Sequence, residues 1–283
     1  MERIGYFNGH IGKLDEMMIP MTDRSVFYGD AVYDAVLVLE GKPFVLGLHL
    51  DRLYNSCALA QIEFTMPRAE LEQEIARLLA YAQEGTTMLY IQVTRGSAPR
   101  KHEFPANTQP NLLMFVGPVA IPPQNKRASL ASIEDLRFRY CNIKTVNLMP
   151  NVFAAQKATS LGATEALLHR GERVTEAAHS SILMLSGGAL VVPPLDELIL
   201  PGITRAVLVD LCQKNDIPVV TRIITVEELM AADEILLCST TKNVIFVYDI
   251  DGKPVGGKDQ VLAGKIQALF AQAVLEDTGV SIA

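Results

Sequence analysis

Apolar residues in the first third of the chain alternate as strands do. The run at residues 31–40, AVYDAVLVLE, is rich in β-branched and aromatic residues, and a Gly-Lys-Pro turn and a second short apolar run follow it. This is the pattern of a hairpin. Short strands around a turn at Asn8-Gly9 are expected before it, and two more apolar strands, MLYIQVTRG and NLLMFVG, after it.

Two stretches between these strands repeat at helical spacing instead. Leu50, Leu53 and Cys57 predict a helix from residue 49 to about 60, and a second helix is predicted from about Arg68 to Gln83. Alternating strands with helices in one segment indicate a sheet that packs against helices.

The stretch GPVAIPPQNK concentrates proline and polar residues between apolar segments, which is typical of a linker. It predicts a smaller N-terminal α/β domain at residues 1–120 and a larger C-terminal α/β domain at 121–283. Expected strands of the second domain are ASLASI, TEALLHR, SILMLSGGALVVPP, EILLCST and IFVYDIDGKPV, with helices near 150–161, 203–214 and 257–276. The fold class is therefore α/β (α+β) with two domains.

Composition and charge narrow the possible classes of function but do not identify one. The 283 residues are 49% hydrophobic and 20% charged, which suits a chain that folds throughout. A net charge of −7 offers no basic surface for nucleic acid or an acidic membrane, so small-molecule partners are expected. The opening residues lack the pattern of a secretion signal and no run of 18 apolar residues occurs, which favours a cytoplasmic location. Four scattered cysteines give no metal-binding spacing.

Lys144 is a candidate for covalent chemistry. In FRYCNIKTVNLMPNVF it is expected at the end of a strand, before a loop that feeds a helix. A neutral lysine amine can form a Schiff base with an aldehyde cofactor, although most lysines only solvate a surface.

Glu176 could complement such a cofactor. Val174-Thr175-Glu176 follows a turn and precedes a small polar loop. An acid beside the ring nitrogen of pyridoxal keeps that nitrogen protonated, so that the ring withdraws electrons from the substrate. The alternative is an exposed glutamate in a turn.

A phosphate site is indicated by Pro201-Gly202 directly before an amphipathic helix, where the N–H groups of Ile203 and Thr204 would point outward. Ser239-Thr240-Thr241, after the apolar strand EILLC, could add hydroxyl donors. Arg52, three residues after His49, could bind phosphate or could pair with Asp51 or another acid.

The order of these motifs resembles a known family. The segments YGDAVYDAV, HLDRLYNS, QVTRGSAPRKHEFP, NIKTVNLM, ALLHRGERVTE, LPGITRAVL and CSTT occur in the order of the fold-type IV pyridoxal-phosphate enzymes. Over nearly the whole chain the sequence most resembles the D-amino-acid aminotransferases.

The resemblance implies that Lys144 is the Schiff-base lysine of pyridoxal 5'-phosphate, at the domain interface, and that it shuttles the α-proton. Glu176 would pair with the pyridine nitrogen. The phosphate would be held by Arg52, Ile203, Thr204, Ser239 and Thr240.

Within this family an Arg-x-His pair and a tyrosine bind the substrate carboxylate, and the resemblance assigns these roles to Arg100, His102 and Tyr33. The loop of the pair would reach a neighbouring subunit, so a homodimer is implied. The expected reaction is ping-pong transamination between D-amino acids (D-alanine, D-glutamate, D-aspartate) and 2-oxo acids. His179 departs from the serine-rich run usual in these enzymes, and the sequence leaves its role open.

Three alternatives remain open. They are a branched-chain L-amino-acid aminotransferase, an aminodeoxychorismate lyase-like enzyme on the same fold, and a non-catalytic binding protein.

Overall fold

The chain folds into two compact units in a computed structural model that describes residues 3–82 and 85–282. One unit comprises Met1–Ala120 and Ile143–Asn147, and the other comprises Ile121–Asn142 and Leu148–Ala283. The expectation of two consecutive segments divided near residue 121 does not include the return of Ile143–Asn147 to the first unit. Each unit is described by itself.

The first unit is an antiparallel six-stranded sheet with the order β2-β1-β6-β5-β3-β4. Its elements are β1 (Ile4–Phe7), β2 (His10–Lys13), the 3-10 turn η1 (Leu14–Glu16), α1 (Arg24–Tyr28), β3 (Ala31–Leu39), β4 (Lys42–Pro43), α2 (Leu46–Leu59), α3 (Arg68–Leu79), β5 (Thr86–Thr94) and β6 (Asn111–Pro118).

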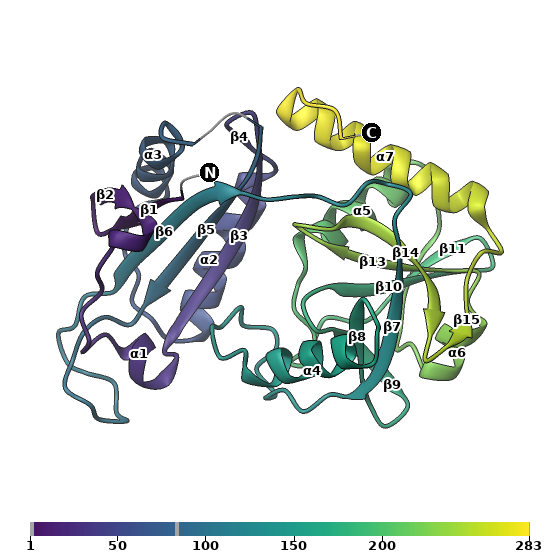
Figure 1. Cartoon of the computed structure of the whole chain (residues 1–283), viewed down its shortest axis with the longest axis horizontal. Coiled ribbons are helices and arrows are strands. Elements are labelled where there is room, and N and C mark those ends of the chain that lie inside the picture. Colours follow the sequence, from purple (N-terminus) through teal and green to yellow (C-terminus); the bar gives the residue numbers. More distant parts are fainter. Residues whose placement is uncertain (1–2, 83–84, 283) are drawn as a thin grey trace. The chain divides into compact units, whose positions relative to one another are not determined.

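Apolar spacing explains how α2 and α3 pack onto this sheet. Leu50, Leu53 and Cys57 of α2 are buried with the apolar residues of β3 and β5 in one core cluster. In Figure 1, α2 lies along the sheet strands. The two expected helices are confirmed, but α3 ends at Leu79 and Gln83 lies outside the described residues.

The second unit is a mixed nine-stranded sheet with the order β12-β11-β10-β13-β14-β7-β8-β9, with β15 paired to β14. The pairs β14–β7, β7–β8 and β11–β12 are parallel. Its elements are β7 (Arg127–Glu134), α4 (Met149–Ser160), β8 (Glu165–Arg170), β9 (Arg173–Ala177), β10 (Ser181–Ser186), β11 (Ala189–Val192), α5 (Ile203–Lys214), β12 (Val219–Thr221), α6 (Val226–Ala231), β13 (Glu234–Ser239), β14 (Asn243–Ile250), β15 (Lys253–Pro254) and α7 (Gln260–Thr278).

The mixture of helices and strands confirms the α/β expectation. The helices expected near 150–161, 203–214 and 257–276 correspond to α4, α5 and α7. Among the described residues, no helix combines the length and the apolar character needed to cross a membrane.

Candidate active site

Lys144 is positioned by backbone bonds to the edge of β3. Tyr33 N donates to the Lys144 carbonyl at 2.8 Å, Val146 N donates to the Ala31 carbonyl at 3.2 Å, and Val32 and Thr145 form an isolated antiparallel bridge. The sequence predicts Lys144 at the end of a strand, and this prediction is wrong. Lys144 lies in an irregular segment whose backbone is held by hydrogen bonds to β3.

The same bonds place the lysine amine over an aromatic ring. Lys144 Nζ lies 4.3 Å from the ring centroid of Tyr33. The Tyr33 ring stacks in turn on Tyr90 of β5, with a centroid separation of 5.4 Å. A cation over such a ring face is attracted by the ring quadrupole, so Tyr33 restricts where the amine can lie.

Arg52 belongs to a buried polar cluster between α2 and β3. Its Nε and Nη2 donate to the two carboxylate oxygens of Asp34, each at 2.8 Å, and His49 Nδ1 lies 2.7 Å from Asp34 Oδ1. Asp51 pairs instead with Arg68 at the surface. Of the two roles considered for Arg52, pairing with an acid is the one observed, and Asp34 fixes the orientation of the guanidinium.

Charges in this cluster are strongly coupled. Burial alone would raise the pKa of Asp34, but the charge of Arg52 and hydrogen bonds from His49 and Arg52 outweigh burial and lower that pKa. Burial lowers the pKa of His49, against the opposing effect of Asp34. Asp34 is thus a buried anion whose ionisation depends on its two neighbours.

Arg100 and His102 lie on a loop that Arg24 holds in place. Arg24 donates to the carbonyls of Lys101, His102 and Glu103, and its Nε pairs with Asp30 at 2.7 Å. Both expected substrate ligands gather around one ring, because the Arg100 guanidinium and the His102 ring each lie 5.3 Å from the Tyr28 centroid.

Tyr33, the third member of the expected carboxylate-binding set, lies with Lys144, whereas Arg100 and His102 lie with Tyr28. Sequence reasoning missed Arg24 and Tyr28, because α1 has only five residues, too few for a periodic pattern. Two signals could have indicated α1. Asp23 caps its first turn, and Gly29 closes it at φ 62°, where a Cβ would lie 2.7 Å from Asn147 Oδ1.

Glu176 lies on β9, at an irregularity in the pairing with β8. Leu167 pairs with Ala177 and His169 pairs with Val174, so β9 carries one residue more than β8 over this interval. Such a bulge breaks the alternation of side chains. As a result, the consecutive residues Thr175 and Glu176 both contact the same guanidinium, that of Arg137.

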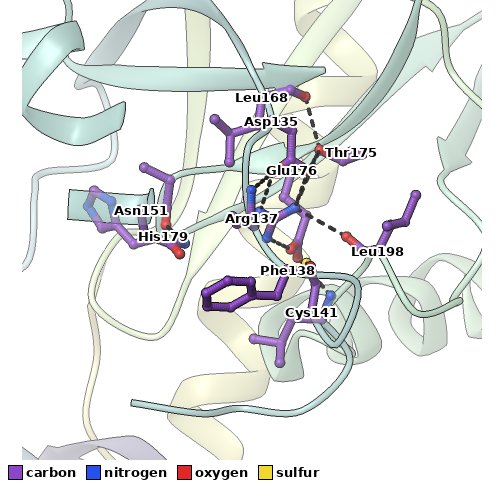
Figure 2. A network of polar contacts seen from close by, with 12 residues as sticks. Asp135, Arg137, Phe138, Cys141, Asn151, Leu168, Thr175, Glu176, His179 and Leu198 are labelled. Atoms are coloured by element: carbon purple, nitrogen blue, oxygen red, sulfur yellow. Dashed lines mark hydrogen bonds and ion pairs between the residues drawn. The ribbon is translucent and has the colours of Figure 1, made fainter. Parts of the chain in front are cut away.

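Figure 2 shows Arg137 between two carboxylates. Its Nη1 donates to Glu176 Oε2, and its Nε and Nη2 donate to Asp135, each at 2.9 Å. The other carboxylate oxygen of Glu176 accepts the N–H of Leu200 at 3.0 Å. The sequence analysis did not single out Arg137, because a lone arginine after a strand has no characteristic spacing.

The start of α5 has the features of an anion site. Ile203 and Thr204 are buried in its first turn, after Gly202, and a Cβ on Gly202 would lie 2.6 Å from Ser181 Oγ. Ser239 ends β13, and its hydroxyl oxygen is buried with no hydrogen-bond partner among the described residues. Thr240 follows in a turn.

His179 belongs to a separate ionic cluster. Its Nδ1 lies 3.0 Å from Glu165 Oε1 and its Nε2 lies 2.7 Å from Lys242 Nζ, while Lys242 also pairs with Glu165 Oε2 at 2.7 Å. Burial alone would raise the pKa of Glu165, but the bond to His179 and the charges of His179 and Lys242 lower it to about 2.

Comparison with known proteins gives a consistent assignment. The family described as "Amino-transferase class IV" matches residues 31–250. The D-alanine aminotransferase of Bacillus licheniformis is 34% identical over 279 residues, which cover 98% of this chain and 99% of that protein.

Solved structures show the same fold. A branched-chain aminotransferase from the archaeon Thermoproteus uzoniensis, crystallised with norvaline, superposes with a TM-score of 0.89 at 21% identity, covering 98% of this chain and 96% of that one. A second branched-chain amino acid aminotransferase, from T.th., is complexed with N-(5'-phosphopyridoxyl)-L-glutamate. It gives a TM-score of 0.86 at 22% identity and covers 98% of this chain and 94% of that one.

Aminotransferases of class IV use pyridoxal phosphate, and the second of these structures holds a derivative of it. The match over most of the sequence and the shared fold lead to one assignment: the chain belongs to the class IV aminotransferase family.

Proposed function

We propose that this enzyme transfers amino groups between D-amino acids and 2-oxo acids, with D-alanine, D-glutamate and D-aspartate as the substrate class. The observation that carries the D-specific part is the gathering of Arg100 and His102 around Tyr28, on a loop whose carbonyls Arg24 holds. A guanidinium and an imidazole on one rigid loop suit a carboxylate, because charge-assisted bonds fix its orientation. The relative in Bacillus licheniformis supports the same substrate class.

The donor groups of the chain fit pyridoxal phosphate. The buried hydroxyl of Ser239 needs a partner, and the first turn of α5, with Ile203 and the buried Thr204, offers N–H groups and the positive end of a helix dipole. We propose that these residues hold the phosphate together with Thr240 and Arg52. Lys144 would bind the aldehyde, and Glu176 would accept a hydrogen bond from the ring N–H.

When bound, the cofactor supplies an aldehyde for the amino group and a ring that withdraws electrons from the substrate Cα. The protein supplies the rest. Lys144 Nζ, restricted by the Tyr33 ring, takes the proton from the substrate Cα and returns a proton in the reverse half of the cycle. Glu176 keeps the proton on the ring nitrogen. Arg100 and His102 hold the substrate carboxylate, which decides the enantiomer that presents its Cα–H to Lys144.

We test the proposal with purified protein, pyridoxal phosphate and 2-oxoglutarate, with D-alanine or L-leucine as the donor. Pyruvate from D-alanine, without turnover of L-leucine, is expected. Arg100→Ala should lower kcat/KM for D-alanine by about tenfold to a hundredfold, the value of a lost charge-assisted bond. Lys101→Ala, in the same exposed loop, is the matched control and should change little.

Turnover of L-leucine alone would replace the proposal with the branched-chain activity. Pyruvate formed over many turnovers per enzyme without any 2-oxo acid would favour a lyase, because a transaminase without an acceptor stops after one turnover.

We also propose a homodimer. The exposed face of α4 carries Met149, Val152 and Phe153 at helical spacing, and Phe138 and Tyr140 are exposed in the segment before it. Apolar groups concentrated in this way favour a protein interface. Sedimentation should show a dimer that Phe153→Asp dissociates, whereas Val261→Asp, at an exposed valine of α7, should leave the dimer intact.

A cytoplasmic location is proposed as well. All four cysteines are free thiols, and Cys57, Cys212 and Cys238 are buried, which suits a reducing compartment. Cell fractionation followed by immunoblotting tests this location.

A further inference from the structure

Arg137 makes several side-chain hydrogen bonds next to Glu176. Besides Glu176 and Asp135, its Nη2 donates to the Leu198 carbonyl at 3.1 Å and to Thr175 Oγ1 at 3.4 Å. Figure 2 shows these contacts converging on the guanidinium. Because the guanidinium is planar and donates in several fixed directions at once, its orientation is determined by the surrounding acceptors.

Arg137 pairs with both acids of this network. Two acids, Asp135 and Glu176, face two arginines, because Arg170 Nε also donates to Asp135 at 3.2 Å. Asp135 has a fully buried side chain, and that of Glu176 is 7% exposed. Without Arg137, Glu176 would lose its ion pair with that guanidinium, and a buried charge that loses its partner is costly.

The network keeps Asp135 ionised. Burial alone would raise the pKa of Asp135, but hydrogen bonds and the charge of Arg137, with a further bond from Thr175, lower it to about 2. Burial also acts to lower the pKa of Arg137, yet its two acid partners raise it. After loss of Arg137, Asp135 would keep its bonds from Arg170 and Thr175.

The geometry of β9 also connects Arg137 with Glu176. The bulge in β9 turns Glu176 toward Arg137, and the carboxylate is then held from both sides, with Arg137 Nη1 on Oε2 and the Leu200 N–H on Oε1.

We infer that Arg137 is a positioning residue, which keeps Glu176 ionised and aimed so that it can take the ring N–H of pyridoxal phosphate. This inference rests on the proposed function, because it assigns Glu176 to the ring nitrogen. Arg137 itself acts through Glu176. Its loss should weaken recognition of the ring nitrogen specifically, rather than cofactor binding in general.

The test compares two probes on the apoprotein: pyridoxal phosphate and 1-deazapyridoxal phosphate, in which carbon replaces the ring nitrogen. Dissociation constants are measured by absorbance titration for the wild type, Arg137→Gln, Arg137→Lys and Glu176→Gln, with Arg170→Gln as the matched control. Arg170 donates to Asp135 and to the Arg137 carbonyl. The ratio of the two constants is internal to each variant, so a general loss of stability affects both probes alike.

The wild type should prefer pyridoxal phosphate over the analogue by about tenfold or more, the value of one charge-assisted bond. In Arg137→Gln and in Glu176→Gln the preference should fall to within about threefold of unity. Arg137→Lys, which keeps the charge, should retain an intermediate preference even if Arg137→Gln fails to fold. Arg170→Gln should keep the preference of the wild type.

Two results overturn the inference in different ways. If Arg137→Gln and Arg137→Lys weaken both probes equally and keep the preference, Arg137 is only structural and the proposed function stands. If the wild type shows no preference, or Glu176→Gln does not change it, the assignment of Glu176 to the ring nitrogen fails, and the inference fails with it.

Discussion

Each unit contains a buried arginine that is paired with acidic side chains, but the number of acids that share the arginine differs between the two units. In the first unit, Arg52 takes both oxygens of Asp34, and His49 joins the same acid. In the second, Arg137 is divided between Asp135 and Glu176. The first arrangement fixes a cation, suited to an anionic phosphate, while the second fixes an anion, suited to a protonated ring nitrogen. The two arrangements thus give different proposed ligands: the guanidinium of Arg52 in the first unit and the carboxylate of Glu176 in the second.

The largest effect is expected at Lys144, the proposed reacting amine. Lys144→Ala should lower the rate of pyruvate formation from D-alanine by about a thousandfold or more, because the general base and the covalent attachment are lost together. Lys157→Ala, on the exposed surface of α4, is the control. A rate for Lys144→Ala within tenfold of the wild type would exclude Lys144 as the reacting amine.

The comparison of Arg52 and Arg137 can be tested by removing one acidic partner from each arginine. Asp34→Asn should lower the free energy of unfolding by about 3–5 kcal/mol, because it leaves the buried Arg52 charge poorly compensated. Asp135→Asn should cost less, about 2 kcal/mol, because Arg137 keeps Glu176. Urea unfolding of the apoproteins measures both, and the reverse order would contradict the charge-sharing argument.

Acid should destabilise the second unit through Glu165. Its pKa is lowered from 4.5 to about 2 in the folded protein, so its stabilisation is complete above the unfolded value and is lost as pH falls through the folded one. About 3 kcal/mol should therefore disappear between roughly pH 5 and 2. Glu165→Gln should remove this part of the pH dependence, and the exposed Glu172→Gln should retain it.

The smallest effects are expected at Ser239, where a substitution should stabilise the apoprotein but weaken the binding of the cofactor. Ser239→Ala removes a buried hydroxyl that lacks a partner among the described residues, so the apoprotein should gain up to about 1 kcal/mol of stability. Binding of pyridoxal phosphate should weaken about fivefold, because one donor is lost. Thermal melting and absorbance titration measure the two effects, and Ser186→Ala, an exposed serine at the end of β10, should change neither.

The sequence predicts well where local spacing determines structure. The buried face of α2, the presence of α4 and α5, the start of α5 after Gly202 and the class IV family all follow from patterns or motifs along the chain. Arg137 and Tyr28 do not, because their roles come from contacts with residues distant in sequence. Arg137 meets Glu176 across 39 positions.

The bulge at Glu176 shows the same limit. Strict alternation would direct Thr175 and Glu176 to opposite faces of β9, and only the pairing with β8 reveals the extra residue. The partner of Arg52 was likewise open between acids, because Asp51 is adjacent in sequence and Asp34 is adjacent only in space.

The return of Ile143–Asn147 to the first unit has a consequence for how this protein is made. The hydroxyl of Thr145 donates to the carbonyl of Ala31, 114 residues earlier. During synthesis the edge of β3 therefore stays incomplete until the first segment of the second unit, Ile121–Asn142, has been made, and such long-range closure is slow. A gene cut at residue 121 would separate this short segment, and Lys144 with it, from the sheet that orders it.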